Sequence, residues 1–319
     1  SKQSIPIYNT YNHIKSFLDV CTVENGKAVA PNGKTRRVLF LGFDGARTDA
    51  LPYIVNDENG SVFAGNAAGN TGAVERLSKT GGLYLAYCGG ETGGETEQTT
   101  STSAGWTTHF TGVWGTKHGV KTNDDVKNSN YETVMLQYAK KGLHTTFAFD
   151  WDQYIDLNLK EEVKYVKDNN LPMLFCDIDR PRKNKLKNTR AETLELYEFV
   201  APKELSPFSP FDCGMRDFVL GRINAGDGII SAIFHNPDSA GHSYGFGDFP
   251  EYRAAVVNCD LYAASILNVI GHLEKTQNEE WLVVLASDHG GIGRGHGGQS
   301  LEERTTWIAT NIAIDEALF

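Results

Sequence analysis

Six short apolar runs recur along this chain, separated by longer stretches that include helical periodicity. Each run is rich in β-branched and aromatic residues and is bounded by turn residues, as expected of strands buried in a parallel sheet. The runs are Arg37–Phe43, Gly82–Tyr87, Thr145–Phe149, Met173–Cys176, Ile229–Phe234 and Trp281–Ala286. The clearest helical stretch is Pro250–Lys275, where apolar residues recur at three- and four-residue steps, namely Ala254, Val257, Leu261, Ala264, Leu267 and Ile270. This alternation predicts an α/β fold with a doubly wound, mostly parallel central sheet and helices on both faces.

The length and composition of the chain suit one large domain. Its 319 residues, 40% of them hydrophobic, are enough for a substantial core. No internal repeat, low-complexity tract or change of composition marks a linker, so we expect a single domain over residues 1–319. The polar and weakly periodic region at about 150–210 is a candidate cap or insertion beside a site.

Charge and hydropathy restrict the partners of the chain. The net charge of -10 argues against a nucleic-acid scaffold, because binding to a phosphate backbone needs clustered lysine and arginine. No window approaches the ~18 consecutive apolar residues of a membrane helix, so we expect no transmembrane segment in this chain. The compartment and the oligomeric state stay open. An extracytoplasmic location is slightly favoured over a cytoplasmic one, because the sequence starts abruptly at Ser1, as it would after removal of a signal or anchor.

The five cysteines form no CxxC pair and show no zinc-finger spacing. Most of them are expected to be buried as small hydrophobic residues, with one disulfide left open.

Three separated segments carry the carboxylates and imidazoles that two divalent metal ions require. The candidate ligands are Asp44, Asp238, His242, Asp288, His289 and His296. This mixture of oxygen and imidazole donors is one that zinc accepts and that a two-metal hydrolase needs. Each aspartate follows a predicted strand, and ligands of such sheets bind outside the carboxyl ends of the strands. The sequence therefore predicts two divalent metal ions, with zinc favoured, at this edge of the sheet.

Taken singly, some of these residues have simpler structural readings. Asp44 could cap a helix that begins at Ala46-Arg47, and Asp238 could begin a loop after Pro237. An isolated histidine is more often a structural hydrogen-bonding group than a ligand. We apply that structural reading to His13, His109, His118, His144, His235 and His272. The joint occurrence of the three segments favours metal binding for the others.

A fourth segment, Ser101-Thr102-Ser103-Ala104-Gly105, supplies hydroxyl groups that could act as a nucleophile. Together the motifs resemble the alkaline phosphatase superfamily, particularly its type I phosphodiesterase/nucleotide pyrophosphatase branch. They are the aspartate at the end of the first long strand, a hydroxyl nine residues before a Thr-Gly pair, PDxxGH at 237–242, SDHG at 287–290 and GHG at 295–297.

The resemblance implies a role for each site residue. One metal ion would lie on Asp238, His242 and His296, the other on Asp44, Asp288 and His289, with Thr102 reaching the latter as nucleophile. Thr102 stands nine residues before Thr111 of the pair Thr111-Gly112, and Ser103 is the rival hydroxyl. The implied reaction is hydrolysis of a phosphodiester or nucleotide-like pyrophosphate through a covalent phospho-threonine intermediate, without a general base. The apolar run that ends at Asn311 corresponds to the strand after the last metal ligand.

Departures from the pattern keep alternatives open. Gly105 stands where the branch places an asparagine that holds a phosphoryl oxygen, and the CxPxR motif of sulfatases is missing. A phosphomonoesterase or a phosphonate hydrolase is the alternative within the enzyme class. A monoesterase would offer a cation to the extra phosphoryl charge, and the nearest candidates are Lys117 and Arg294. The non-enzyme alternative is a metal-binding pseudoenzyme that recognises a phosphorylated ligand.

Aromatic residues also lie near the candidate nucleophile. They are Trp106, Phe110 and Trp114, and they would either stack on a substrate ring or belong to the core, the commoner role of aromatics near a helix.

Overall fold

Each of the six predicted strands forms, with bounds within two residues of those expected. They are β4 (Thr35–Phe43), β5 (Gly82–Tyr87), β6 (Thr145–Phe149), β7 (Met173–Asp177), β9 (Ile229–Phe234) and β10 (Glu279–Ala286). The computed structural model describes residues 4–51, 72–125, 128–151, 153–177, 185–187 and 211–319. Its further strands are β1 (Ile5–Pro6), β2 (Thr22–Glu24), β3 (Lys27–Val29), β8 (Lys185–Lys187) and β11 (Thr305–Thr310).

All these strands belong to one sheet. Its order is β1-β5-β11-β10-β4-β9-β6-β7-β8, with β2 and β3 attached beside β4. The neighbours from β10 to β7 run parallel to one another, whereas β11 is antiparallel to both β5 and β10. The predicted α/β fold with a mostly parallel sheet is therefore confirmed.

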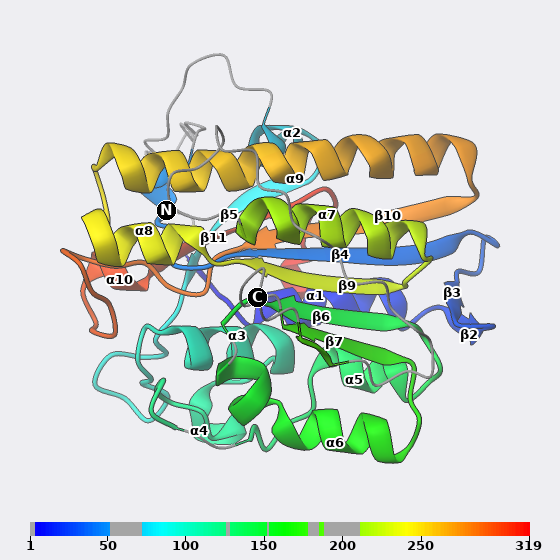
Figure 1. Ribbon diagram of the computed structural model, residues 1–319, viewed down its shortest axis with the longest axis horizontal. Coiled ribbons are helices and arrows are strands. Elements are labelled where there is room, and N and C mark those ends of the chain that lie inside the picture. The colour runs from blue at the N-terminus through cyan, green and yellow to red at the C-terminus, as the bar shows by residue number, and fades with distance from the viewer. Residues whose placement is uncertain (1–3, 52–71, 126–127, 152, 178–184, 188–210) are drawn as a thin grey trace.

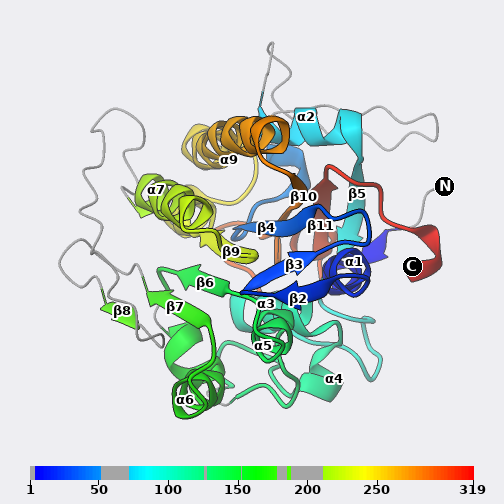
Figure 2. The same cartoon turned by 90° about the vertical axis from the view of Figure 1, so that its right-hand side faces the viewer.

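Helices cover both faces of the sheet (Figure 1). One face carries α2 (Ala73–Thr80), α7 (Phe211–Asn224) and α9 (Pro250–Thr276), and the other carries α1 (Asn9–Leu18), α3 (Thr102–Thr111) and α5 (Val134–Ala139). The end view in Figure 2 shows the same two layers of helices on either side of the strands. The remaining helices are α4 (Gly115–His118), α6 (Lys160–Asp168), α8 (Asn236–Tyr244) and α10 (Leu301–Arg304), with short turns η1 (Thr48–Ala50), η2 (Tyr154–Asn158) and η3 (Glu316–Leu318).

The central strand β4 is buried on both faces because its side chains alternate between the two layers. Leu39 and Leu41 pack in the core cluster that includes α9, and Val38 and Phe40 pack in the cluster that includes α3. A strand buried in this way reads in sequence as a continuous apolar run. The run that predicts β4 is therefore apolar because helices cover both faces of the sheet.

Helix α9 forms as predicted, but its buried face differs from the predicted stripe. Leu261, which belongs to the periodic apolar set, is 49% exposed, whereas Cys259 and Ala263 are fully buried. By length and composition, α9 is the one helix in the described part of the chain that could cross a membrane. Its buried side chains pack into the core against the sheet.

The candidate cap at about 150–210 is described only in part. Its described residues form η2, α6, β7 and β8, and β7 pairs with β6 in the central sheet. Residues 152, 178–184 and 188–210 of this region lie outside the described residues.

All five cysteines lie in the described part of the chain, and four of them are buried, as expected of small hydrophobic residues. No disulfide joins any of these five, so the disulfide left open by the sequence does not form.

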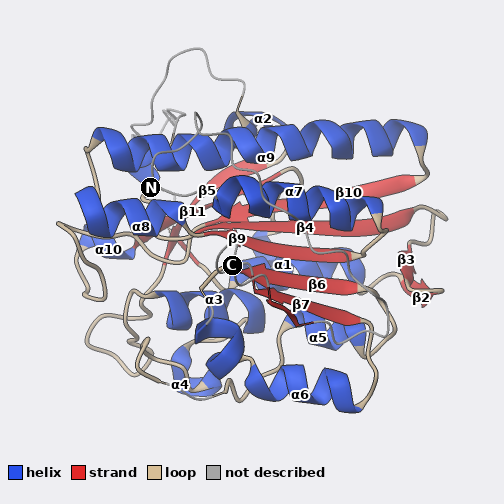
Figure 3. Ribbon diagram, in the orientation of Figure 1, coloured by secondary structure: helices blue, strands red, loops and turns tan. Residues whose placement is uncertain are grey.

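Three adjacent parallel strands direct the predicted ligands to one end of the sheet. In the order β10-β4-β9, Asp288 lies two residues beyond β10, Asp44 follows β4 directly, and Asp238 lies in the first turn of α8 after β9. Figure 3 shows α8 and α10 at this same end of the strands. The fold therefore brings segments from opposite ends of the chain to a single edge.

Candidate metal centre and active site

The six predicted ligands lie together at the carboxyl end of the sheet, beside Thr102. A first group, in which each residue offers one ligand atom within 4.8 Å of the others, is Asp44, Asp288 and His289, and all three are fully buried. The Nε2 atom of His289 lies 3.4 Å from Asp44 Oδ1 and 3.5 Å from Asp288 Oδ2. This group has the composition that the resemblance implies for one metal ion.

A second group shares a residue with the first. It consists of Asp238, His289 and His296, again with ligand atoms within 4.8 Å of one another. Asp238 Oδ1 lies 3.4 Å from His296 Nε2 and 3.6 Å from His289 Nε2. His242, which the resemblance places in this group, lies at its outer side, with Nε2 3.3 Å from Asp238 Oδ2 and 3.2 Å from His296 Nε2. His289 therefore stands between the two groups, and His242 borders the second.

The three histidines share one hydrogen-bonding pattern. In each ring Nδ1 is held by a backbone carbonyl oxygen: Gly290 O for His289 at 2.6 Å, Thr100 O for His296 at 2.8 Å and Arg294 O for His242 at 2.9 Å. A carbonyl oxygen accepts only, so Nδ1 carries the proton that is donated. Each Nε2 is thereby left facing the carboxylates, the arrangement usual for histidines that bind a metal ion.

The charges of the first group call for a cation. Burial and the neighbouring Asp44 carboxylate hold the pKa of Asp288 well above its usual range. Burial lowers the pKa of His289, but Asp288, Asp238 and Asp44 outweigh it and raise this pKa to about 10. The proton on His289 thus supplies the positive charge among the carboxylates, and a metal ion would displace it.

One buried carboxylate oxygen in each group also fits a cation. Among the described residues, Asp238 Oδ1 and Asp288 Oδ2 are buried and accept no hydrogen bond. Buried polar atoms are normally paired, and carboxylate oxygens left in this state are suited to a metal ion. Burial and the charge of His289 lower the pKa of His296 to about 4, so its ring is neutral at pH 7, as a ligand must be. The residues present therefore fit two divalent ions.

Thr102 is the hydroxyl that the fold brings to the first group. It is the first residue of α3, is 4% exposed, and places Oγ1 3.4 Å from Asp44 Oδ1 and 3.5 Å from His289 Nε2. The start of a helix also favours negative charge, because its N–H groups and dipole point outward there. The rival hydroxyl of Ser103 is buried and, among the described residues, has no hydrogen-bond partner. The geometry favours Thr102 over Ser103.

Trp106, one turn further along α3, forms a hydrogen bond with the first group. Its indole N–H donates to Asp44 Oδ2 at 3.0 Å, and its ring is fully buried. A Cβ at Gly42 would lie 2.4 Å from this ring, so glycine in β4 leaves room for it. Trp106 thus belongs to the core and orients Asp44. The Asp44 carboxylate accepts hydrogen bonds from the Trp106 indole N–H and the Thr102 hydroxyl, and the next helical turn begins only at Thr48, so Asp44 is not a helix cap.

Gly105 faces the metal groups at close range. A Cβ at this position would lie 2.7 Å from the carbonyl oxygen of Asp288, so no asparagine fits there. An asparagine lies nearby instead: Asn123 Oδ1 accepts the backbone N–H of Ser103 at 2.9 Å, which places its amide at the start of α3. Because Oδ1 is engaged, the group of Asn123 left for a ligand is its NH₂ donor. No motif in the sequence pointed to Asn123, since it lies 21 residues from Thr102.

Of the six histidines expected to be structural, the described contacts set His235 apart. His13, His109 and His118 are buried and bond to Thr310, to Ser287 O and to Thr108, respectively. His235, by contrast, lies 3.6 Å from Asp238 Oδ2 and 3.0 Å from Asp150 Oδ1. His235 belongs to no ligand motif, so the sequence predicted only a structural role for it, whereas the structure places it beside Asp238.

Neither of the two candidate cationic side chains forms a described hydrogen bond or ion pair with Thr102. Lys117 is exposed on α4, and the side chain of Arg294 is exposed in the loop before His296. Among the described residues, no lysine or arginine side chain forms an ion pair or hydrogen bond with Thr102 or with the carboxylates of Asp44, Asp238 and Asp288.

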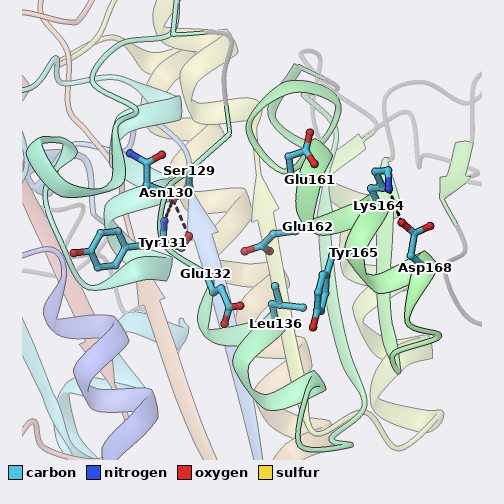
Figure 4. Close-up of a pocket in the computed structure, with 10 residues that line it drawn as sticks. All are labelled: Ser129, Asn130, Tyr131, Glu132, Leu136, Glu161, Glu162, Lys164, Tyr165 and Asp168. Atoms are coloured by element: carbon cyan, nitrogen blue, oxygen red, sulfur yellow. Dashed lines mark hydrogen bonds and ion pairs between the residues drawn. The ribbon is translucent and has the colours of Figure 1, made fainter.

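A separate cavity of about 290 Å³ lies away from these groups, between α5 and α6 (Figure 4). None of the residues that line it is a predicted site residue, and four of them are carboxylates, which would repel a phosphate ester. One of these, Glu162, accepts the backbone N–H of Thr133 at 2.7 Å and its hydroxyl at 2.9 Å, and so joins α6 to the start of α5. Its acidic lining does not suit a phosphate ester, and the Glu162 contact joins two helices.

Glu162 is expected to make stability fall as pH rises. Burial raises its pKa to about 7 from an ordinary value of 4.5. Between these two pH values Glu162 is protonated in the folded state and ionised in the unfolded state. The contribution of Glu162 is fully present below about pH 4.5 and is lost as pH rises through about 7. The Glu162→Gln variant stays neutral and can still accept from Thr133. Thermal unfolding at a series of pH values should show wild type losing stability relative to Glu162→Gln across this window, and parallel curves would contradict it.

Searches for related proteins found similarity in structure and none in sequence. No family model and no curated protein matches the chain. The phosphonoacetate hydrolase from Sinorhizobium meliloti 1021, solved with phosphonoformate, is 13% identical, with a TM-score of 0.53 over 85% of this chain. A mutant of the TAB5 alkaline phosphatase, with magnesium in its M3 site, is 15% identical, with a TM-score of 0.51 over 88% of this chain.

The two relatives differ in length. The chain covers 60% of the phosphonoacetate hydrolase and 94% of the alkaline phosphatase. At these identities the comparison concerns the fold, and the resemblance inferred from the motifs is confirmed at that level. The chain therefore has the alkaline phosphatase-like α/β fold.

Proposed function

We propose that this protein is a two-metal phosphoric ester hydrolase, similar to the type I phosphodiesterase/nucleotide pyrophosphatase branch of the alkaline phosphatase superfamily. The observation that carries the proposal is the position of Thr102. Its hydroxyl oxygen lies beside Asp44 and His289 at the start of α3, where two groups of metal-competent side chains share His289. A metal ion held by such groups would lower the pKa of the neighbouring hydroxyl and activate it as a nucleophile.

Each residue has a definite task in the proposed reaction. Asp44, Asp288 and His289 would hold one divalent ion, and Asp238, His296, His289 and His242 the other, with zinc favoured by the mixture of ligands. When bound, the ions lower the pKa of a hydroxyl or water and stabilise charge on the phosphoryl oxygens. The Thr102 hydroxyl gives up its proton and its oxygen attacks phosphorus in line, while the bond from phosphorus to the leaving oxygen breaks and that group departs as an alcohol. The product is a phospho-threonine that keeps the other ester group. Water then attacks the same phosphorus and the bond to Thr102 breaks, which releases a phosphomonoester and restores the threonine hydroxyl.

A diester substrate suits the charges of the site better than a monoester. A phosphomonoester carries an additional negative charge, which is normally met by arginine or lysine. In the described part of the chain no such side chain is paired with Thr102 or the carboxylates, and the donor at the start of α3 is the neutral amide of Asn123. This favours a singly charged phosphoryl group, as in a phosphodiester or a pyrophosphate linkage.

The substrate class is tested with a chromogenic phosphodiester, its monoester counterpart and a phosphonate, each hydrolysed by zinc-loaded protein. We expect kcat/KM for the diester to exceed that for the monoester by at least about tenfold, since one missing charge-assisted hydrogen bond costs about 1.5–3 kcal/mol. Monoester preference would indicate a phosphatase with a cationic group that the described residues do not show. Release of phosphate from the phosphonate alone would indicate a phosphonate hydrolase.

The pseudoenzyme alternative differs in its prediction. A binding module would hold zinc and a phosphorylated ligand without turning over any of these esters. The retention of all six predicted ligands and of Thr102 at the first group supports an enzyme.

A further inference from the structure

His235 lies where β9 passes into α8, three residues before Asp238. Its backbone is fixed on the α7 side: Asp212 Oδ1 accepts the N–H of His235 at 3.0 Å, and Asp212 Oδ2 accepts that of Asn236 at 3.1 Å. Asp212 itself is buried. Two consecutive N–H groups are thus tied to one carboxylate, which fixes the direction of the chain as it enters the turn that carries Asp238.

The ring of His235 spans two carboxylates. Nδ1 lies 3.0 Å from Asp150 Oδ1, and Nε2 lies 3.6 Å from Asp238 Oδ2. Asp150 follows β6, which runs parallel to β9, so the two strands end side by side and present Asp150 to His235. The ring of Phe149 packs against the imidazole at 5.6 Å in an edge-to-face arrangement. Asp150 and Phe149 together hold the ring in one orientation.

The two carboxylate oxygens of Asp238 face different residues. Oδ2 faces His235 and His242, whereas Oδ1 faces His289 and His296 and accepts no hydrogen bond among the described residues. A carboxylate free to turn about its Cβ–Cγ bond would present either oxygen to an ion. The imidazoles of His235 and His242, both within ion-pair distance of Oδ2, restrict that rotation.

We infer that His235 is a positioning residue that, anchored by Asp150, holds Asp238 Oδ2 and thereby directs Oδ1 toward the second metal ion. The inference rests on the proposed two-metal hydrolase, and it assigns a role to a residue outside the ligand motifs. Groups that hold a ligand in this way typically change metal affinity by about 10- to 100-fold when removed. Among the described residues, no hydrogen bond or ion pair joins His235 to Thr102.

Two amide variants separate the contacts of the ring. In His235→Gln the side-chain NH₂ falls near the position of Nε2 and can still reach Asp238. In His235→Asn it falls near Nδ1 and reaches only Asp150. His235→Ala removes both contacts. The control is His13→Gln, which alters another buried histidine, bonded to Thr310 and Ile312 and remote from the ligands.

Zinc affinity is measured by competition between each metal-free protein and a chromogenic zinc chelator, and the melting temperature of the metal-free protein reports folding. We expect His235→Asn and His235→Ala to bind one of two zinc ions about 10- to 100-fold more weakly, His235→Gln to be substantially restored, and His13→Gln to match wild type. For diester hydrolysis at fixed zinc, kcat should follow the loss of the ion, with KM unchanged.

Two results would overturn the inference. Equal zinc affinity in His235→Asn and His235→Gln would show that Asp238 does not depend on the Nε2 contact. A third zinc ion in wild type that is lost from His235→Ala would make His235 and Asp150 ligands instead. Failure of the proposed function is a separate result, because it would appear as absent hydrolysis in wild type while the zinc titrations still compare the variants.

Discussion

Replacing Thr102 with alanine is expected to reduce the turnover of a phosphodiester by about 10³-fold or more while leaving both metal ions bound. Loss of a covalent nucleophile removes the low-barrier route altogether, and comparable nucleophile deletions in other hydrolases cost about 10⁶-fold. Metal binding should persist because the ligand atoms of both groups come from aspartate and histidine. Steady-state kinetics and the zinc content of the dialysed protein measure the two effects separately.

Matched variants make this result specific. Thr102→Ser keeps a hydroxyl at the start of α3 and should retain measurable turnover. Ser103→Ala removes the rival hydroxyl, which is buried and faces no ligand atom by hydrogen bond among the described residues, and should stay close to wild type. After acid quenching during turnover of the diester, wild type should carry on Thr102 one phosphoryl group that keeps the ester substituent that did not leave, measured by mass spectrometry. Loss of turnover in Ser103→Ala with activity kept in Thr102→Ala would assign the nucleophile to Ser103.

Replacing His289 with alanine is expected to weaken the binding of both metal ions at once. The structure places His289 Nε2 in both groups, 3.4 Å from Asp44 and 3.6 Å from Asp238. Because each bound ion contributes several kcal/mol to stabilising the transition state, turnover should fall by about 10³-fold or more. Zinc retained after dialysis should drop from two ions per chain to fewer than one.

His242→Ala provides the comparison. His242 borders only the second group and its side chain is 46% exposed, so this variant should lose one ion and keep the other. The motif resemblance assigns His289 to one ion alone. If His289→Ala lost a single ion and bound the second with wild-type affinity, that simpler division of ligands would hold and the shared position would be a feature of the metal-free site.

The strands and the ligand motifs could be predicted because their causes are local. A strand such as β4, covered by helices on both faces, is apolar along its buried part Val38–Phe43, and an aspartate directly after it stands out. The adjacent pair Asp288-His289 is conspicuous for the same reason. Each of these features is formed by consecutive residues, so a single sequence is enough to find it.

The contacts that arrange the ligands could not be predicted in this way. Trp106 meets Asp44, Asn123 meets Ser103 and His235 meets Asp238 only after the sheet order is known. The buried face of α9 was misjudged for a related reason. A periodic stripe shows that a helix is amphipathic, but a long helix that packs on the sheet and on neighbouring helices buries more than one stripe, and Cys259 is inside while Leu261 is outside.

The antiparallel strand β11 has a consequence for the way this chain is made. In the described structure β5 pairs only with β1 and β11, and β11 joins it to β10. β11 follows all the other described strands in sequence, so β1 and β5 cannot join the rest of the sheet through β11 until Thr305–Thr310 has left the ribosome. Until then one edge of β5 and one edge of β10 are unpaired, and such edges can pair with other chains during folding.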